Sequence, residues 1–530
     1  MAHQFRPRHA FLAFGLTALS LFAQFLVRMV MTSTLGAGAA YDAFLLAMMP
    51  AALMATVGFQ AMAAALVPRI SDQLVAGNIP AARQLFRNAS LATFAFWSVI
   101  GVVIIGWTCF FSSESGRYGK NLPLIMTGVI GGWGLIMGWT ILQGQLLIYF
   151  GRFAVSCLAN MLPAVFMLAR AMIAPAPQVM DFVIYGLAGQ ALSLAIQTYA
   201  ARVGWRKWAP EKTDYGTMQS VRDGSTPLIA APAIVQLAIA SLPIFLASFN
   251  AQASGLIDQS FAAWWKVGGL AILGAALAVV RLPQTLADSV MISTSYGMMT
   301  HAVSQVKLCN DPAHRARMSF VFRHLVNLQC FIVLPAAAFT LVYHESIAEF
   351  LYMRGKFGPD DAQRTGAILA WYSLCAPGQL MQGVQVPILV ALGRASVALR
   401  YEILLTVMSA VLDYALLPFF DLPGIVISTG ISVSVAGLFI YRALCRMNVG
   451  IAYGDIWLAA ARPFGALLAT LVAGLAALLV MKLSSPGIGA FWKMFIGGGV
   501  MACVFYGLMW LYPPQRMASS GHHVTMEVAP

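Results

Sequence analysis

The sequence predicts an all-α polytopic membrane protein with about fourteen transmembrane helices, in two pseudo-repeated six-helix lobes followed by two C-terminal helices. Of its 530 residues, 60% are hydrophobic and only 10% are charged, whereas about a quarter of the residues in a soluble domain are charged. The apolar residues form long runs separated by polar gaps, and a short motif occurs once in each half. These features together indicate an internally duplicated helical membrane protein.

Each apolar run is long enough to cross the hydrocarbon as a helix, which takes about 20 residues. The alternating ten-residue pattern of an outer-membrane barrel does not occur, so helices must satisfy the backbone polar groups. The predicted spans are 11–31, 42–67, 88–111, 122–150, 153–173, 180–201, 226–249, 262–300, 322–351, 362–392, 398–419, 423–445, 460–482 and 490–512.

Two short motifs, each of which occurs twice, predict the duplication. The pattern N-x-P-A-x-R stands at 78–83 and again at 310–315, each time in a polar gap, and Gly151-Arg152 and Gly393-Arg394 each follow a long apolar run. Repeats of about six spans are typical of transporters. The predicted units are a first lobe at 1–202, a basic cytoplasmic connector at 203–225, a second lobe at 226–445, two helices at 446–512 and a polar tail at 513–530.

The net charge of +13 is explained by membrane topology rather than by nucleic-acid binding. Most Lys and Arg residues fall in the gaps on the side of the N-terminus, so the positive-inside rule places both termini in the cytoplasm. The seven cysteines are scattered and show neither a disulfide framework nor a metal-binding spacing.

Charged residues inside spans are the main candidates for a functional site, because each costs about 2.5–3.5 kcal/mol on insertion scales. Arg281 and Asp288 are seven residues apart in one span, which places them on the same helix face as parts of one polar cavity wall. The planar guanidinium of Arg281 suits a phosphate or pyrophosphate. The alternative is that Arg281 pairs with a carboxylate of a neighbouring helix.

Three further charges are candidates with open alternatives. Arg28 could bind the same anion or extend to the outer interface, and Asp42 could act in gating or coupling or cap its own helix. Asp288 and Asp413 are candidates for proton or cation coupling, or for static ion pairs. The polar connector between Tyr343 and Arg364 could gate the outer mouth of the cavity or be a solvated loop.

Missing motifs argue against an enzyme and against a cofactor. The sequence has no Walker A loop, no H-E-x-x-H and no G-x-S-x-G. ATP-driven transport by this chain alone is therefore not expected, and a membrane-embedded glycosyltransferase is a weak alternative.

Several short segments occur in a characteristic order along the chain. They are Leu35–Phe44 (LGAGAAYDAF), Val67-Pro68, Gly151–Val155 (GRFAV), Arg281-Leu282 and Leu351–Phe357 (LYMRGKF). In sequence and order they resemble the MviN/MurJ family of lipid II flippases, within the multidrug/oligosaccharidyl-lipid/polysaccharide exporter superfamily.

The resemblance implies two six-helix lobes around a central cavity, and two extra helices whose groove could accept a polyprenyl tail. It implies that Arg281 engages a lipid-linked pyrophosphate and that Asp42 is functionally important, whereas Arg28 is shifted by about one residue from the family position. The chain departs from the family at Pro50–Ala55 (PAALMA), where two basic residues are lost, and around Phe59-Gln60, where a Glu-Gly pair is replaced. A cavity with less positive charge should hold a pyrophosphate less tightly.

The resulting hypothesis is a bacterial inner-membrane flippase that moves a polyprenyl-pyrophosphate-linked saccharide, such as lipid II, by alternating access. Its expected partners are this substrate and membrane lipid, with no metal and no nucleic acid. The alternatives are a flippase for another undecaprenyl-linked exopolysaccharide or O-antigen unit, a cation-coupled exporter of small amphipathic compounds, and a non-transporting membrane scaffold.

Overall fold

The computed structural model describes residues 7–59, 78–115, 123–150, 152–173, 177–207, 252–308, 311–484 and 489–511, together with single positions between 62 and 73 and at 246 and 249. Twelve helices in this part of the chain are long and apolar enough to cross a membrane. The all-α fold class is confirmed, with fourteen spans as an approximate number. The predicted span 226–249, most of the connector and the tail lie outside the described residues.

The described helices occur in the following order along the chain. They are α1 (Pro7–Leu35), α2 (Ala39–Leu53) continued by the π-helix η1 (Met54–Phe59), α4 (Ile79–Ser115), α5 (Pro123–Tyr149), α6 (Phe153–Ile173), α7 (Val179–Lys207), a helical segment at 252–265, α9 (Gly269–Leu308), α10 (Pro312–Tyr352), α11 (Pro359–Ala391), α12 (Ala395–Phe420), α13 (Leu422–Arg446), α14 (Asp455–Ser484) and α15 (Ala490–Leu511).

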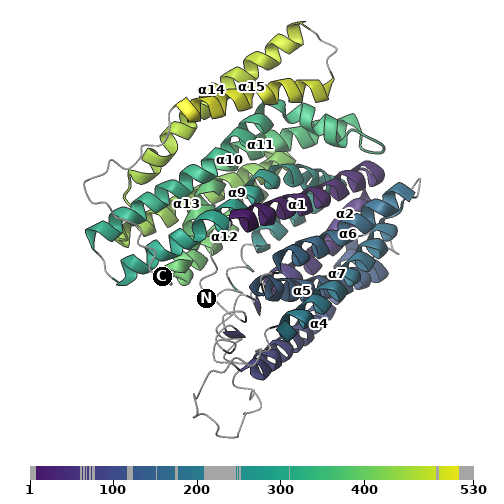
Figure 1. The fold of residues 1–530 in the computed structure, drawn as a ribbon. Coiled ribbons are helices and arrows are strands. Elements are labelled where there is room, and N and C mark those ends of the chain that lie inside the picture. The colour runs from purple at the N-terminus through teal and green to yellow at the C-terminus, as the bar shows by residue number, and fades with distance from the viewer. Residues whose placement is uncertain are drawn as a thin grey trace.

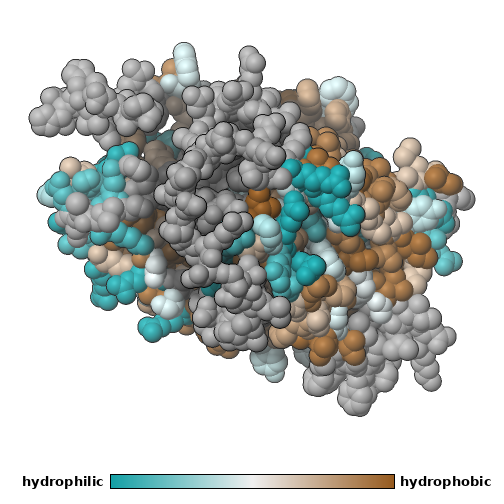
Figure 2. Space-filling view, turned by 60° about the horizontal axis from the view of Figure 1, so that its bottom comes forward, coloured by the Kyte–Doolittle hydropathy of each residue, from teal (hydrophilic) through white to brown (hydrophobic). Residues whose placement is uncertain are grey.

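The helices pack in two groups and one appended pair (Figure 1). Helices α2, α4, α5, α6 and α7 pack mainly on one another, and so do α9 to α13. Helix α1 contacts both α6 and α9, so it lies between the groups. Helices α14 and α15 pack on α10, at the edge of the second group that faces away from the first (Figure 1). In the view of Figure 2, apolar side chains cover broad stretches of the surface between hydrophilic areas, as expected for flanks that meet lipid.

Glycines let helices of the first group approach closely. A Cβ added to Gly134 of α5 would lie 2.7 Å from the Cα of Ala51, and one added to Gly138 would meet the ring of Phe59. Small residues at helix contacts are a common device of membrane proteins. Here Gly134 and Gly138 allow α2 and η1 to pack closely against α5.

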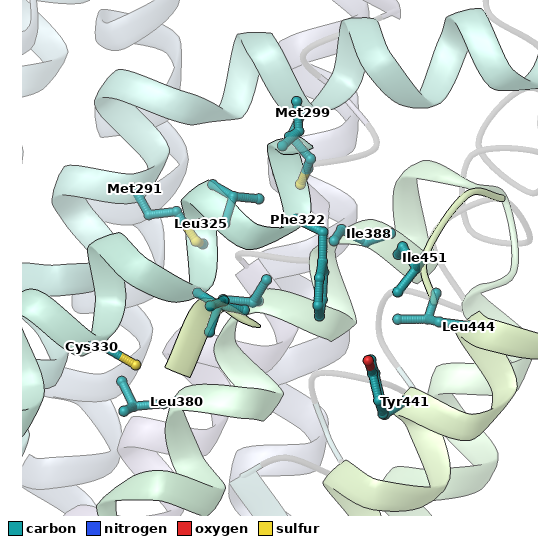
Figure 3. Packing of buried hydrophobic residues seen from close by; sticks show 14 of the residues in the cluster. Met291, Met299, Phe322, Leu325, Cys330, Leu380, Ile388, Tyr441, Leu444 and Ile451 are labelled. Atoms are coloured by element: carbon teal, nitrogen blue, oxygen red, sulfur yellow. The ribbon is translucent and has the colours of Figure 1, made fainter. Parts of the chain in front are cut away.

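The largest apolar core of the second group lies between α9, α10, α11 and α13 (Figure 3). The rings of Phe322 and Tyr441 stack at its centre, with centroids 5.9 Å apart. The Tyr441 hydroxyl donates to the Ala452 carbonyl at 2.6 Å and accepts from the Ile456 amide. This core therefore also fixes the start of α14.

The two N-x-P-A-x-R motifs take equivalent places in the two groups. Arg83, in the first turns of α4, donates to the carbonyl of Trp205 near the end of α7 at 2.8 Å. Arg315, in the first turn of α10, lies 3.4 Å from the Asn448 side chain just after α13. In each group the motif thus joins the start of one helix to the end of another.

Two predicted boundaries are wrong. The span predicted at 262–300 runs across a turn, because Gly268 has a positive φ of 84° and separates the helical segment 252–265 from α9. The predicted connector between Tyr343 and Arg364 is largely helical, since α10 continues to Tyr352 and α11 begins at Pro359.

The short connection that remains there touches the first group. The Lys356 amide donates to the Ser33 carbonyl at 2.9 Å, and Gly355 adopts a positive φ of 63° beside the same carbonyl. We call this region, formed by residues 33–42, 266–271 and 353–358, the closed end of the bundle. Among the described residues, three hydrogen bonds join the first group to the second there, from the amides of Lys356, Gly268 and Ala271.

Candidate functional site

A cavity of about 710 Å³ lies in the second group, between α9, α11, α12, α13 and the helical segment 252–265. Its wall is mainly apolar and carries a limited number of polar side chains. The charged residues that line it are Asp258, Arg281, Asp288 and Glu402, joined by Gln284, Gln379, Gln382 and Thr429.

Arg281 projects into this cavity from α9, as its spacing to Asp288 predicts. Its side chain is exposed, and its Nη2 atom would lie 4.0 Å from a Cβ added to Gly255. Arg281 forms no salt bridge within the described part of the chain, although it lies within electrostatic range of Asp258. Arg281 is the single cation among the lining residues, so its guanidinium is available to an anionic ligand.

Asp288 lines the same wall two turns further along α9. Its Oδ1 accepts from Nε2 of Gln329, a buried residue of α10, at 2.9 Å. Gly383 of α11 leaves room for this pair, since a Cβ there would lie 3.3 Å from Gln329. Asp288 is therefore held by an amide, and no cation pairs with it among the described residues.

Glu402 of α12 is a second carboxylate held by an amide. Nε2 of Gln382 donates to its Oε1 at 2.7 Å, and the Glu402 side chain is buried. Glu402 falls in the predicted span 398–419, but sequence analysis did not single it out. The signal that could have found it is the insertion cost of a carboxylate within that span.

Asp413 stands beside a carboxylate that the sequence analysis missed. Asp258 accepts from the hydroxyls of Thr429, at 3.0 Å, and Ser409, at 3.3 Å, and its carboxyl group interacts directly with that of Asp413. Both Asp413 oxygens are buried, and among the described residues neither has a hydrogen-bond partner at bonding geometry, although the Ser428 hydroxyl is near. Two adjacent carboxylates repel each other unless a proton or a cation lies between them.

Asp258 escaped prediction because the segment 250–261 reads as a polar gap between two predicted spans. In the structure residues 252–261 are helical, and Asp258 lines the cavity with Ser254 and Gly255. The spacing of Ser254 and Asp258, four residues apart, is the signal that could have indicated one helix face.

Asp42 lies at the closed end and does not line the cavity. Its fully buried carboxylate accepts from the backbone amides of Gly268, at 2.6 Å, and Ala271, at 2.8 Å. It thus caps the N-terminus of α9, where an anion also meets the positive end of the helix dipole. The alternative that Asp42 caps its own helix is wrong, because α2 begins after Gly38 without a side-chain cap.

Arg28 lies on α1 with an exposed side chain and is not among the lining residues of the cavity. It is within electrostatic range of Tyr41 and Tyr352, which belong to opposite groups at the closed end. The structure therefore brings Arg281, Asp288, Asp258 and Glu402 together and leaves Arg28 and Asp42 nearer the closed end.

Comparisons with solved structures support this architecture. A structure described as lipid II flippase MurJ in an inward closed conformation has a TM-score of 0.69 at 15% identity, covering 95% of this chain and 98% of the other. An inward-facing multidrug resistance MATE family transporter of the MOP superfamily has a TM-score of 0.62 at 14% identity, covering 83% and 98%. A MOP superfamily transporter from Pyrococcus furiosus has a TM-score of 0.56 at 15% identity, covering 83% and 94%. At these identities the likeness concerns the fold.

Sequence comparison identifies the family. The probable lipid II flippase MurJ of Rhizobium meliloti (strain 1021) is 28% identical over 156 residues, which span 29% of this chain and only 28% of that relative's length. The family model described as lipid II flippase MurJ matches residues 31–496. Because this match covers well over half of the sequence, the chain belongs to the lipid II flippase MurJ family.

Proposed function

We propose that this multi-pass protein of the bacterial inner membrane moves a polyprenyl-pyrophosphate-linked saccharide, lipid II or a close chemical relative, between leaflets by alternating access. The observation that carries the proposal is the cavity wall on which one unpaired guanidinium, Arg281, stands among amide and carboxylate groups. The guanidinium suits a pyrophosphate. The amide and carboxylate groups suit the hydroxyls of a saccharide.

In this proposal the lobes at 1–202 and 226–445 move as two bodies, and the closed end faces outward with both termini in the cytoplasm. Asp42 then acts as a latch between the lobes, and Arg28 meets the substrate anion only as it passes toward the closed end. Opening this end requires the Asp42 carboxylate to leave the amides of Gly268 and Ala271. The polyprenyl tail stays outside, along α14 and α15.

The driving ion is proposed to bind at Asp258 and Asp413. Three observations support this proposal. Both Asp413 oxygens lack a hydrogen-bond partner among the described residues, the Thr429 and Ser409 hydroxyls donate to Asp258, and Asp258 lines the cavity with Arg281. Oxygen ligands suit a hard monovalent cation, and the carboxylates alone suit a proton. In this proposal Asp288, which accepts a hydrogen bond from Gln329, binds the saccharide of the substrate and not the driving ion.

The test measures lipid II exposure in the outer leaflet of cells depleted of their own flippase. The wild-type chain should restore exposure, Arg281→Ala at equal abundance should not, and Arg364→Ala, at an exposed position of α11 outside the cavity, should behave as wild type. If the well-expressed wild-type chain restores nothing, lipid II is not its substrate, and another undecaprenyl-linked saccharide must be tested.

One observation favours a second candidate, a cation-coupled exporter of small amphipathic compounds. Three carboxylates, Asp258, Asp288 and Glu402, face one cation in the cavity wall, which suits a positively charged compound. This function requires Asp258 or Asp413 and tolerates Arg281→Ala, the reverse of the flippase result. A non-transporting scaffold would tolerate both changes.

A further inference from the structure

A second cavity, of about 470 Å³, lies between α10, α14 and α15, apart from the central cavity. Its lining combines three leucines of α14 with charged side chains from all three helices. The leucines are Leu471, Leu475 and Leu478, and the charged residues are Lys482, Lys493, Glu345 and Glu349. The function proposed above runs the polyprenyl tail along α14 and α15 but gives the charged side chains of this cavity no role.

Helix α10 is kinked beside this cavity. Tyr343 has a non-helical backbone, with φ of −109° and ψ of 20°, inside the helix. Its hydroxyl donates to the Gly474 carbonyl of α14 at 3.2 Å, and a Cβ on Gly497 of α15 would collide with its ring. The buried tyrosine therefore wedges between the two C-terminal helices, and the cavity lies beside this wedge.

The four charged side chains of this cavity lie at the same height along the helix axes, near the connection between α14 and α15. Lys482 is in the last turn of α14 and Lys493 in the first turn of α15. Glu345 and Glu349 are four residues apart and so share one face of the outer part of α10. The cavity thus offers two ammonium groups and two carboxylates together.

The surroundings place this level at the membrane–water interface. Phe491, Trp492 and Phe495 at the start of α15 are exposed, and aromatic residues gather at such interfaces. Leu475, which lines the cavity, is itself 56% exposed, and the adjacent Leu468 and Leu479 are also exposed. The apolar floor of the cavity therefore continues onto the lipid-facing surface of α14.

We propose that this cavity binds a phospholipid whose head group carries both a phosphate and a primary amine. The phosphate lies between Lys482 and Lys493, the ammonium group donates to Glu345 and Glu349, and one acyl chain follows Leu471, Leu475 and Leu478. Charge complementarity selects this ligand. Among the described residues, a purely anionic head group leaves Glu349 without a donor and Glu345 with only the His344 imidazole, 4.0 Å away, and a quaternary ammonium has no N–H to donate.

The test uses the purified full-length protein in detergent, delipidated and titrated with phosphatidylethanolamine, phosphatidylcholine or phosphatidylglycerol while native mass spectrometry records bound lipid. Phosphatidylethanolamine should bind most tightly. The double change Lys482→Ala with Lys493→Ala should weaken its binding by about tenfold or more, since charge-assisted bonds to phosphate are lost. The matched control, Arg394→Ala with Arg400→Ala, removes two exposed cations elsewhere and should have no effect.

Two further double variants test recognition of the ammonium group and of the phosphate separately. Glu345→Gln with Glu349→Gln should abolish the preference for phosphatidylethanolamine over phosphatidylglycerol while retaining affinity for phosphate. Lys482→Arg with Lys493→Arg should restore binding, which excludes misfolding as the cause of the alanine result. Soluble phosphoethanolamine should compete weakly, because it lacks the acyl chain. Equal binding of all three lipids, preference for phosphatidylglycerol, or no effect of the lysine changes would overturn the proposal.

Discussion

The carboxylate of Asp42 in α2 and the backbone amide of Gly268 before α9 are 2.6 Å apart and join the two helical groups. The contact is fully buried, and the same carboxylate also holds the amide of Ala271. Its acceptor atoms belong to one group and its donors to the other. Asp42 is therefore the side chain that ties the two groups together at this end, beside the backbone hydrogen bond from Lys356 to Ser33.

We expect Asp42→Ala to weaken the closed end, because it removes a charged acceptor from two buried amides, at about 1.5–3 kcal/mol per bond. A cysteine pair replacing Ser33 and Lys356, in a background without other cysteines, reports closure, since these residues share a 2.9 Å backbone hydrogen bond. Disulfide yield should fall several-fold with Asp42→Ala and less with Asp42→Asn. An unchanged yield would show that the remaining contacts suffice.

Gly268→Ala should destabilise the same end for a different reason. The residue has a positive φ of 84°, and a Cβ would lie 2.5 Å from the Ala37 carbonyl. Strained backbone of this kind costs of the order of 1–3 kcal/mol. The midpoint of thermal unfolding in detergent should fall relative to Gly454→Ala, where a Cβ meets nothing within 4 Å.

Asp413→Asn should raise the thermal stability of the protein and abolish its stabilisation by the bound ion. Replacing one of two adjacent carboxylates removes their repulsion, so the variant should unfold at a higher temperature than wild type in buffer without small cations. Wild type should gain stability as sodium replaces a bulky organic cation, whereas Asp413→Asn and Asp258→Asn should gain none. If sodium has no effect on wild type at any pH, a proton is the coupling ion that remains.

Arg83→Ala should cost more stability than Arg315→Ala. Arg83 donates to the Trp205 carbonyl at 2.8 Å and lies 5.7 Å from the centroid of its ring, contacts that together contribute about 1–3 kcal/mol. The side-chain hydrogen bond of Arg315 to Asn448 is longer, at 3.4 Å, and exposed to solvent. Thermal unfolding of the two variants side by side measures the difference, and an equal loss would contradict it.

The sequence predicted the features that depend on local pattern. Apolar runs located the helices, because membrane helices must satisfy their own backbone, and the seven-residue spacing of Arg281 and Asp288 placed both on one cavity wall. The repeated N-x-P-A-x-R motif indicated equivalent positions, which Arg83 and Arg315 occupy.

Features that depend on a partner distant in the sequence were not predictable in the same way. From the sequence, Asp42 is a candidate cap of its own helix, but the amides from which it accepts lie at the start of α9, more than 200 residues away. Asp258 lies in a segment whose polar composition predicts a loop. Its hydrogen bonds with Ser409 and Thr429, which are more than 150 residues away, cannot be deduced from the local pattern. A hydropathy pattern carries no information on such pairings.

The closed end relies largely on main-chain atoms, and this has a consequence for how sequences of this architecture diverge. The Ser33 carbonyl, the Lys356 amide and the amides of Gly268 and Ala271 are present whatever side chains those positions carry. Most side chains of the closed end can therefore change without loss of these backbone contacts. The requirements are an acidic residue at position 42 and the tight turns at positions 268 and 355. The variation that natural selection can use for new cargo is then concentrated in the wall of the central cavity.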